Sequence, residues 1–225
     1  VNAGGEVFAE SGGGSRPLAA GEPVFQGDEI VTGPAANVEI RFADDSILAQ
    51  GPASRMSLDE FVYDPDESED SSLLYGAATG TFRLVTGKIA EANPDSVDIK
   101  TPLATIGIRG TGMDIVSADD GVKVGIFAYH KFDVVITTER GTTFITDGDT
   151  IIEVFSDGSF GEPRPYTEME KHEIEAMAPI TSTGFIRDDN DENGQGDQGE
   201  EAGAGQDGGE GDESGDSGDD QDSGD

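Results

Sequence analysis

Hydrophobic and polar residues alternate along much of the chain with a period of two residues. In the segment NVEIRFA, Val38, Ile40 and Phe42 take the apolar positions, and polar residues lie between them. This alternation is typical of strands that bury one face and expose the other. The same pattern occurs in SVDIK at 96–100, VKVGIFA at 122–128 and KFDVVITT at 131–138.

Turn signals separate these segments at intervals of roughly 8–12 residues, which is the spacing of short strands in all-β folds. The sequence therefore predicts an all-β fold with many short strands, arranged as a sandwich or as a solenoid-like β-domain. The turn signals are Gly27-Asp28, Asp44-Asp45, Gly51-Pro52, Asp119-Asp120-Gly121, Arg140-Gly141, Asp147-Gly148 and Asp157-Gly158.

One helix is predicted near the end of the apolar part of the chain, in PYTEMEKHEIEAMAP at 165–179. Thr167 followed three residues later by Glu170 forms a capping-box pattern, and Pro179 marks the end of the helix. We expect this helix to pack against the sheet edge and to cap the domain. Three regions follow from these patterns: an all-β domain at 1–160, a capping helix and connector at 161–187, and a tail at 188–225.

Charge is distributed very unevenly between these regions. The tail holds 16 acidic residues and no Lys or Arg, so it carries −16 of the total net charge of −35. Its only hydrophobic residues are two alanines, which cannot offset the entropy of ordering the chain. We therefore expect the tail to be disordered. The acidity of the remaining chain argues against binding to nucleic acid or to anionic membranes, and no apolar run is long enough to insert into a membrane.

The tail contains one pattern with metal chemistry, in DNDENGQGDQGE. Asp189, Asp191, Asn193 and Glu200 match the spacing of a calcium-binding loop, with Gly194 at the sharp turn. The segment consists largely of the residue types that the pattern requires, so a chance match competes with a real loop. Weak association of Ca²⁺ with the acidic tail as a whole is the alternative. No other cofactor is predicted.

The chain shows no strong signal for catalysis. It has no cysteine, and its two histidines, His130 and His172, have no metal-ligand partner nearby in the sequence. An enzyme acting on envelope glycans would need two converging carboxylates. The best candidates for these are Asp59, Glu60 and Asp64, but a strand end followed by a turn explains them better. We therefore predict a protein without enzymatic activity.

The stretch TPLATIGIRGT at 101–111 is the most distinctive in the sequence. Pro102 cannot donate to a strand ladder and restricts the residue before it, so it should end the preceding strand. The glycines permit a positive φ or a close backbone approach, while the isoleucines should point inward. We interpret the stretch as a structural corner formed by Thr101, Pro102, Ala104, Thr105, Ile106, Gly107, Ile108, Arg109, Gly110 and Thr111.

Arg109 is the one residue of this corner whose role the pattern leaves open. If Ile108 points inward, Arg109 points to the opposite face, where a covered guanidinium would require a carboxylate. We expect a structural ion pair with Asp59, Glu60 or Asp114.

Three segments together resemble the FecR-type domain of exported bacterial proteins. They are GDEIVTGPAANVEIRFADDSILAQGPASRMSLDEFVYDP, GTFRLVTGKIA and VDIKTPLATIGIRGTGMDI, and their order and spacing are similar to those of the family over roughly residues 5–155. In the signalling members, a cytoplasmic domain that restrains a sigma factor and a transmembrane helix precede the FecR domain. Neither feature is seen in this sequence, so a sigma-factor role is not expected. The segments EFVYDP and GTFRLVTGKIA are most similar to the soluble exported subset of the family found in proteobacteria.

The resemblance implies an all-β domain without catalytic residues that acts through protein contacts. It predicts an exported interaction or sensing module, periplasmic or extracellular, whose partner is another envelope or secreted protein. The alternatives are a calcium-responsive surface or matrix protein and an envelope glycan-acting enzyme.

Overall fold

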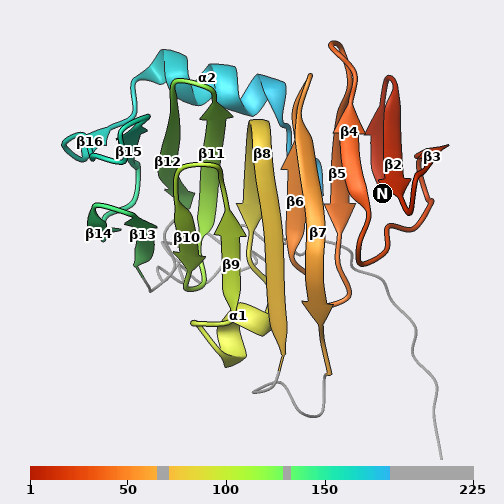
Figure 1. Cartoon of the computed structure of the whole chain (residues 1–225), viewed down its shortest axis with the longest axis horizontal. Coiled ribbons are helices and arrows are strands. Elements are labelled where there is room, and N and C mark those ends of the chain that lie inside the picture. Colours follow the sequence, from red (N-terminus) through yellow and green to blue (C-terminus); the bar gives the residue numbers. More distant parts are fainter. Residues whose placement is uncertain (65–70, 129–132, 183–225) are drawn as a thin grey trace, which may run out of the picture. The chain divides into compact units, whose positions relative to one another are not determined.

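The computed structural model describes residues 1–64, 71–128 and 133–182 of the chain. The chain divides into two units, Val1–Arg187 and Asp188–Asp225, and all described residues belong to the first. Within them, sixteen strands and two short helices are present, and the strands form two sheets that share one long strand (Figure 1). The all-β prediction is confirmed.

The first sheet, sheet A, contains eight strands in which every neighbouring pair is antiparallel. In spatial order its strands are β1 (Asn2–Gly4), β5 (Asn37–Arg41), β6 (Ile47–Gln50), β8 (Ser72–Val85), β11 (Gly112–Ala118), β12 (Gly121–Ala128), β15 (Thr150–Phe155) and β16 (Arg164–Pro165).

The second sheet, sheet B, is antiparallel except for the pair β8–β9. In spatial order its strands are β3 (Gly14–Pro17), β2 (Val7–Ser11), β4 (Glu29–Thr32), β7 (Arg55–Val62), β8, β9 (Val97–Lys100), β10 (Thr105–Ile108), β13 (Val134–Thr138) and β14 (Gly141–Ile145). A parallel pair requires a crossover connection, and helix α1 (Lys88–Ala92) lies in the connection between β8 and β9.

Strand β8 belongs to both sheets. Its first half pairs with β7 and β9 in sheet B, and its second half pairs with β6 and β11 in sheet A. The change of sheet occurs at Gly80, which has a φ of +116°. A Cβ on Gly80 would lie 1.9 Å from the Ser54 hydroxyl oxygen. Only glycine therefore fits where β8 passes Ser54.

The inward-facing residues of the two sheets form one hydrophobic core. Phe82 and Leu84 of sheet A and Tyr75 of sheet B are almost fully buried in it. The predicted alternation is confirmed in β5, β9 and β12, where Val38, Ile99 and Val124 point into this core. Residues 131 and 132 of the predicted strand at 131–138 lie outside the described part, which contains β13 from Val134 onward.

Helix α2 (Glu168–Met177) confirms the predicted capping box. The Thr167 side chain accepts a hydrogen bond from the Glu170 amide, and the Glu170 carboxylate accepts one from the Thr167 amide. The expected location at a sheet edge is wrong, because Ile174 of α2 packs against Ile151 and Val116 on the outer face of sheet A. No helix among the described residues is long and apolar enough to span a membrane.

The Gly80→Ala substitution should destabilise the protein by about 2–4 kcal/mol, because it combines an unfavourable φ with a steric clash against Ser54. Gly27 is a suitable control, since its φ is +86° but nothing lies within 4 Å of a Cβ built there. Urea unfolding should show a clearly smaller loss for Gly27→Ala. Equal losses for the two variants would contradict a packing role for Gly80.

Candidate functional site

A row of residues crosses the outer face of sheet A, on the side opposite the hydrophobic core. The strand register places one residue of each strand directly beside the next. This row contains two buried charged residues at its centre and small or apolar residues beside them. In order across the sheet it consists of Glu39, Ala49, Arg83, Asp114, Gly125 and Ile151.

Arg83 and Asp114 form a buried ion pair at the centre of this row. The Arg83 Nε donates to Asp114 Oδ1 at 2.9 Å, and the two side chains are 9% and 3% exposed. The Tyr166 hydroxyl donates to the second oxygen, Asp114 Oδ2, at 3.0 Å. Both carboxylate oxygens of Asp114 are therefore hydrogen-bonded, as a buried charge requires.

Burial and hydrogen bonding act in opposite directions on the pKa of Asp114. Removal from water raises its pKa, while the charge and hydrogen bond of Arg83 and the hydrogen bond of Tyr166 lower it, and the net result is a raised pKa. Burial, followed by the negative charge of Asp114, raises the pKa of Tyr166 well above its ordinary value. Tyr166 therefore stays protonated, and its hydroxyl group donates a hydrogen bond to the Asp114 carboxylate.

Two glycines make room for the aromatic rings around the ion pair. A Cβ on Gly125 would lie 2.0 Å from the Tyr166 hydroxyl oxygen, and one on Gly112 would lie 2.8 Å from the Phe127 ring. The Phe127 ring packs against the Arg83 guanidinium, whose central carbon lies 4.1 Å from the ring centroid. This stacking adds a cation–π contact to the ion pair.

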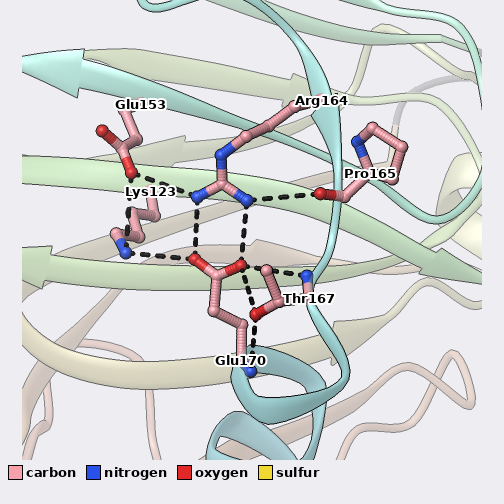
Figure 2. Close-up of polar contacts among 6 residues, drawn as sticks. All are labelled: Lys123, Glu153, Arg164, Pro165, Thr167 and Glu170. Atoms are coloured by element: carbon pink, nitrogen blue, oxygen red, sulfur yellow. Dashed lines mark hydrogen bonds and ion pairs between the residues drawn. The ribbon is translucent and has the colours of Figure 1, made fainter.

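A second polar cluster fixes the N-terminus of α2 on sheet A (Figure 2). The Arg164 guanidinium binds the Glu170 carboxylate through two hydrogen bonds of 2.9 and 2.8 Å. Lys123 of β12 donates to the same carboxylate at 3.3 Å, and Glu153 of β15 lies 3.3 Å from Arg164. Because Glu170 also caps the helix through Thr167, one carboxylate both starts α2 and attaches it to the sheet.

The chain beyond α2 is bound at the far end of the same row. The Glu39 carboxylate accepts hydrogen bonds from the backbone amides and hydroxyl groups of Thr181 and Ser182. Burial alone would raise the pKa of Glu39, but these hydrogen bonds outweigh it, so the pKa is lowered. The segment after α2 is therefore held on β5 by charge-assisted hydrogen bonds.

A pocket of about 390 Å³ opens between α2 and the outer face of sheet A. The ion pair forms part of its wall, and Glu175 of α2, 65% exposed, lies 3.7 Å from Arg83. The wall combines two cations, two carboxylates, an aromatic ring and two aliphatic side chains. It is lined by Arg83, Asp114, Phe127, Ala128, Lys171, Glu175 and Ile180.

The stretch 101–111 forms a tight turn followed by a change of sheet. The Thr101 hydroxyl accepts from the Ala104 amide at 2.9 Å, which closes the hairpin between β9 and β10. Ile106 and Ile108 are fully buried, and Gly110 has a φ of +84° where the chain leaves sheet B for β11 of sheet A.

The predicted partner of Arg109 is wrong. Its guanidinium lies 2.6 Å from a carboxylate oxygen of Asp95 rather than near Asp59, Glu60 or Asp114. The Arg109 side chain is 40% exposed, so its face is not covered as expected, and an ion pair this exposed contributes little to stability. Asp114 is instead occupied by Arg83 and Tyr166, from a neighbouring strand and from the segment before α2.

Other predicted site residues lie apart from this pocket or outside the described part. Asp59, Glu60 and Asp64 do not line it, and Glu60 accepts a hydrogen bond from Ser72. His172 is exposed on α2. Within the described ranges, no group of three or more metal-ligating side chains is present. His130 and the predicted calcium ligands Asp189, Asp191, Asn193 and Glu200 lie outside those ranges, so the calcium site stays a prediction.

Sequence reasoning did not identify Arg83 as part of a site. Arg83 lies between two buried apolar residues in TFRLV, and Asp114 has the same setting in GMDIV. Opposite charges at polar positions of two alternating segments were the available signal. The signal was weak because four other strands also carry a charged residue between two buried apolar ones: Glu39, Asp98, Lys123 and Glu153.

Comparison with known proteins identifies the domain to which this site belongs. The family model described as FecR protein matches residues 28–128, which agrees with the resemblance that the motifs predicted. The match spans β4 to β12 and includes Arg83, Asp114 and Phe127, while Tyr166 and α2 lie beyond it. None of the curated proteins matches the sequence.

Solved structures provide a second comparison. Two crystal structures of a protein from Parabacteroides distasonis ATCC 8503, described as a "putative anti-sigma factor", each align over 64% of this chain and 62% of their own. One has 14% identity and a TM-score of 0.51, and the other 10% and 0.49. At 14% identity, the structure with the TM-score of 0.51 shows a shared fold and nothing further. The chain spans 62% of the length of these structures.

The contribution of the buried ion pair to the stability of the fold can be tested with a double-mutant cycle. Asp114→Leu should destabilise the fold by about 3–5 kcal/mol, because it removes the buried, hydrogen-bonded partner of Arg83 and leaves only the longer contact with the exposed Glu175. The double variant Arg83→Leu/Asp114→Leu should lose less than the sum of the two single variants. Denaturant unfolding measures all three. Strictly additive losses would contradict the coupling of the two side chains.

The contribution of Glu170 should depend on pH. Hydrogen bonds from Arg164 hold its pKa well below the ordinary value, so its stabilisation is complete above the unfolded pKa of about 4.3 and is lost as the pH falls below that value. The difference in unfolding free energy between the wild type and Glu170→Gln should therefore shrink between about pH 5 and pH 2. Glu173→Gln, an exposed control on the same helix, should change stability by less than about 0.5 kcal/mol throughout.

Proposed function

We propose that this chain is a non-enzymatic regulatory or sensing module that is exported and acts by binding another protein of the envelope or the cell exterior. The FecR-type domain supports the regulatory class. The observation that carries the proposal is the pocket beneath α2, whose floor is the buried pair Arg83–Asp114. The Arg83–Asp114 pair lies within the segment that the FecR model matches, whereas α2, which forms the opposite wall, lies beyond it.

The chemistry of the pocket suits recognition better than catalysis. Both oxygens of Asp114 are occupied by donors, which leaves this carboxylate poorly placed to act as a general base. Among the described residues, no Ser, Cys or His lines the pocket, so this part of the wall offers no nucleophile of these types. Aromatic, aliphatic and charged groups together can receive a side chain with an apolar body and a polar tip, such as the Tyr and Arg anchors of protein interfaces.

The attachment of α2 supports a sensing role. Among α2 residues, Ile174 is buried, while Met169 and Met177 are substantially exposed. The helix is therefore held largely by polar contacts, through Glu170 at its start and through Glu39 beyond its end. Elements with few buried apolar contacts open at lower free energy than the core. A partner that engages the pocket thus meets a movable wall.

A pull-down from the native envelope, with the full chain as bait, tests this function. Glu175→Lys reverses a charge on the pocket wall and should reduce recovery of the partner about tenfold, as the loss of one good interface contact does. Glu173→Lys makes the same change on α2 at a residue that does not line the pocket, and should leave recovery unchanged. Thermal unfolding of both variants checks that the fold is intact. Background recovery with the wild type, or equal recovery with both variants, would contradict the proposal.

A further inference from the structure

The two sheets end in four edge strands within the described residues, and three of them are protected against further pairing. Strand β1 has three residues and β16 only two, one of them Pro165. Strand β3 carries the charged Arg16 and ends at Pro17. Short length, proline and charge are the devices by which natural sheets block additional strands.

The fourth edge strand, β14, lacks all of these devices. Its sequence GTTFI spans Gly141–Ile145 without a charged residue or proline, and it pairs only with β13 among the described strands. Ile145 is buried in the core, while Phe144 on the opposite face is 51% exposed. The strand thus presents a regular unpaired edge next to an exposed aromatic side chain.

The surface beside this edge is apolar and rich in threonine, which suits contact with the side chains of an added strand. Phe144 lies directly opposite Val135 of β13, and Thr142 lies opposite Thr137. The two threonine hydroxyls are 3.1 Å apart. An added strand would place alternate side chains over this apolar and threonine-rich surface, as cross-strand neighbours in sheets do.

The charge around the hairpin selects the kind of strand that fits. Five of the six acidic residues between positions 133 and 157 lie outside the strands, around the hairpin. Two of these five are paired with nearby cations, Asp157 with Arg140 and Asp149 with Lys171. A second copy of this chain would bring like charge, since the net charge is −35. A basic segment would instead gain favourable electrostatics. The acidic residues are Asp133, Glu139, Asp147, Asp149 and Asp157.

We propose that β14 is a docking edge for an extended segment of a partner protein, with alternating β-branched or aromatic residues flanked by Lys or Arg. The segment adds as a further strand to sheet B. The inference deepens the proposed function and rests on it, because the occupant is part of a protein partner. It uses a surface separate from the pocket beneath α2, so the two can fail independently.

Selection from a library of random ten-residue peptides on the immobilised full chain tests the docking edge. Enriched peptides should alternate β-branched or aromatic residues and carry basic ends. Their affinity, measured by fluorescence anisotropy, should fall at least tenfold for Phe144→Lys. Phe25→Lys is the matched control, because Phe25 is 57% exposed in a loop, and should bind like the wild type. Absence of enriched peptides, or equal binding to Phe144→Lys, would overturn the proposal.

A pair of proline variants distinguishes strand addition from side-chain contact. Successive residues of a strand direct their amides to opposite edges, so one of Thr142→Pro and Thr143→Pro removes an outward donor and the other removes a donor to β13. The variant that removes the outward donor should lose peptide binding with little change in melting temperature. The variant that removes the donor to β13 should have a lower melting temperature. If neither variant loses peptide binding, a pairing role for the β14 backbone is excluded.

Two further outcomes separate the proposals. Peptide binding that is lost in Glu175→Lys and kept in Phe144→Lys would move the interaction to the pocket and overturn the docking edge. Peptide binding at β14 together with a failed pull-down would uphold the edge and contradict the pocket. A dimer seen by analytical ultracentrifugation and dissociated by Phe144→Lys would make a second copy the occupant, against the proposal.

Discussion

The buried ion pair between Arg83 and Asp114 is the constraint on which the rest of the outer face of sheet A depends. Two charges on a sheet face cost free energy unless they are paired, hydrogen-bonded and kept in a fixed geometry. Tyr166 completes the hydrogen bonds of the carboxylate, and Phe127 covers the guanidinium. Since Tyr166 comes directly before α2, the requirement of one ion pair brings the C-terminal part of the chain onto the sheet.

On the same face, a part of the chain that the FecR family model does not match covers residues that it does match. Arg83 and Asp114 lie within residues 28–128, whereas the tyrosine and the helix that cover them follow it. The cover is attached by carboxylates at both ends, Glu170 at the start of α2 and Glu39 beyond its end. Polar attachment of this kind is specific in geometry but contributes less free energy than the hydrophobic core. The domain thus combines a two-sheet hydrophobic core with a helix whose two ends are attached through carboxylates.

The two surfaces proposed for binding differ in their physical character. The pocket beneath α2 is concave and contains balanced charges, so it suits a side chain that inserts from a partner. The β14 edge is linear, and its recognition would come from backbone hydrogen bonds that any extended segment can make. Selectivity at this edge would therefore depend on charge and on the surface around Phe144. A regulatory module with both surfaces can bind one partner at two points and gain avidity.

The sequence by itself determined the strands and the corner at 101–111, because a period of two and the properties of proline and glycine are local. It also predicted the capping box of α2 from Thr167 and Glu170, whose contact spans three residues. Only the tertiary structure decided which charges meet. Arg109 pairs with Asp95 and Arg83 with Asp114 because the strand register brings them together. An alternating pattern predicts which face of the sheet a charged residue occupies, but not which strand lies beside it. The ion pair and the pocket could therefore be identified only from the tertiary structure.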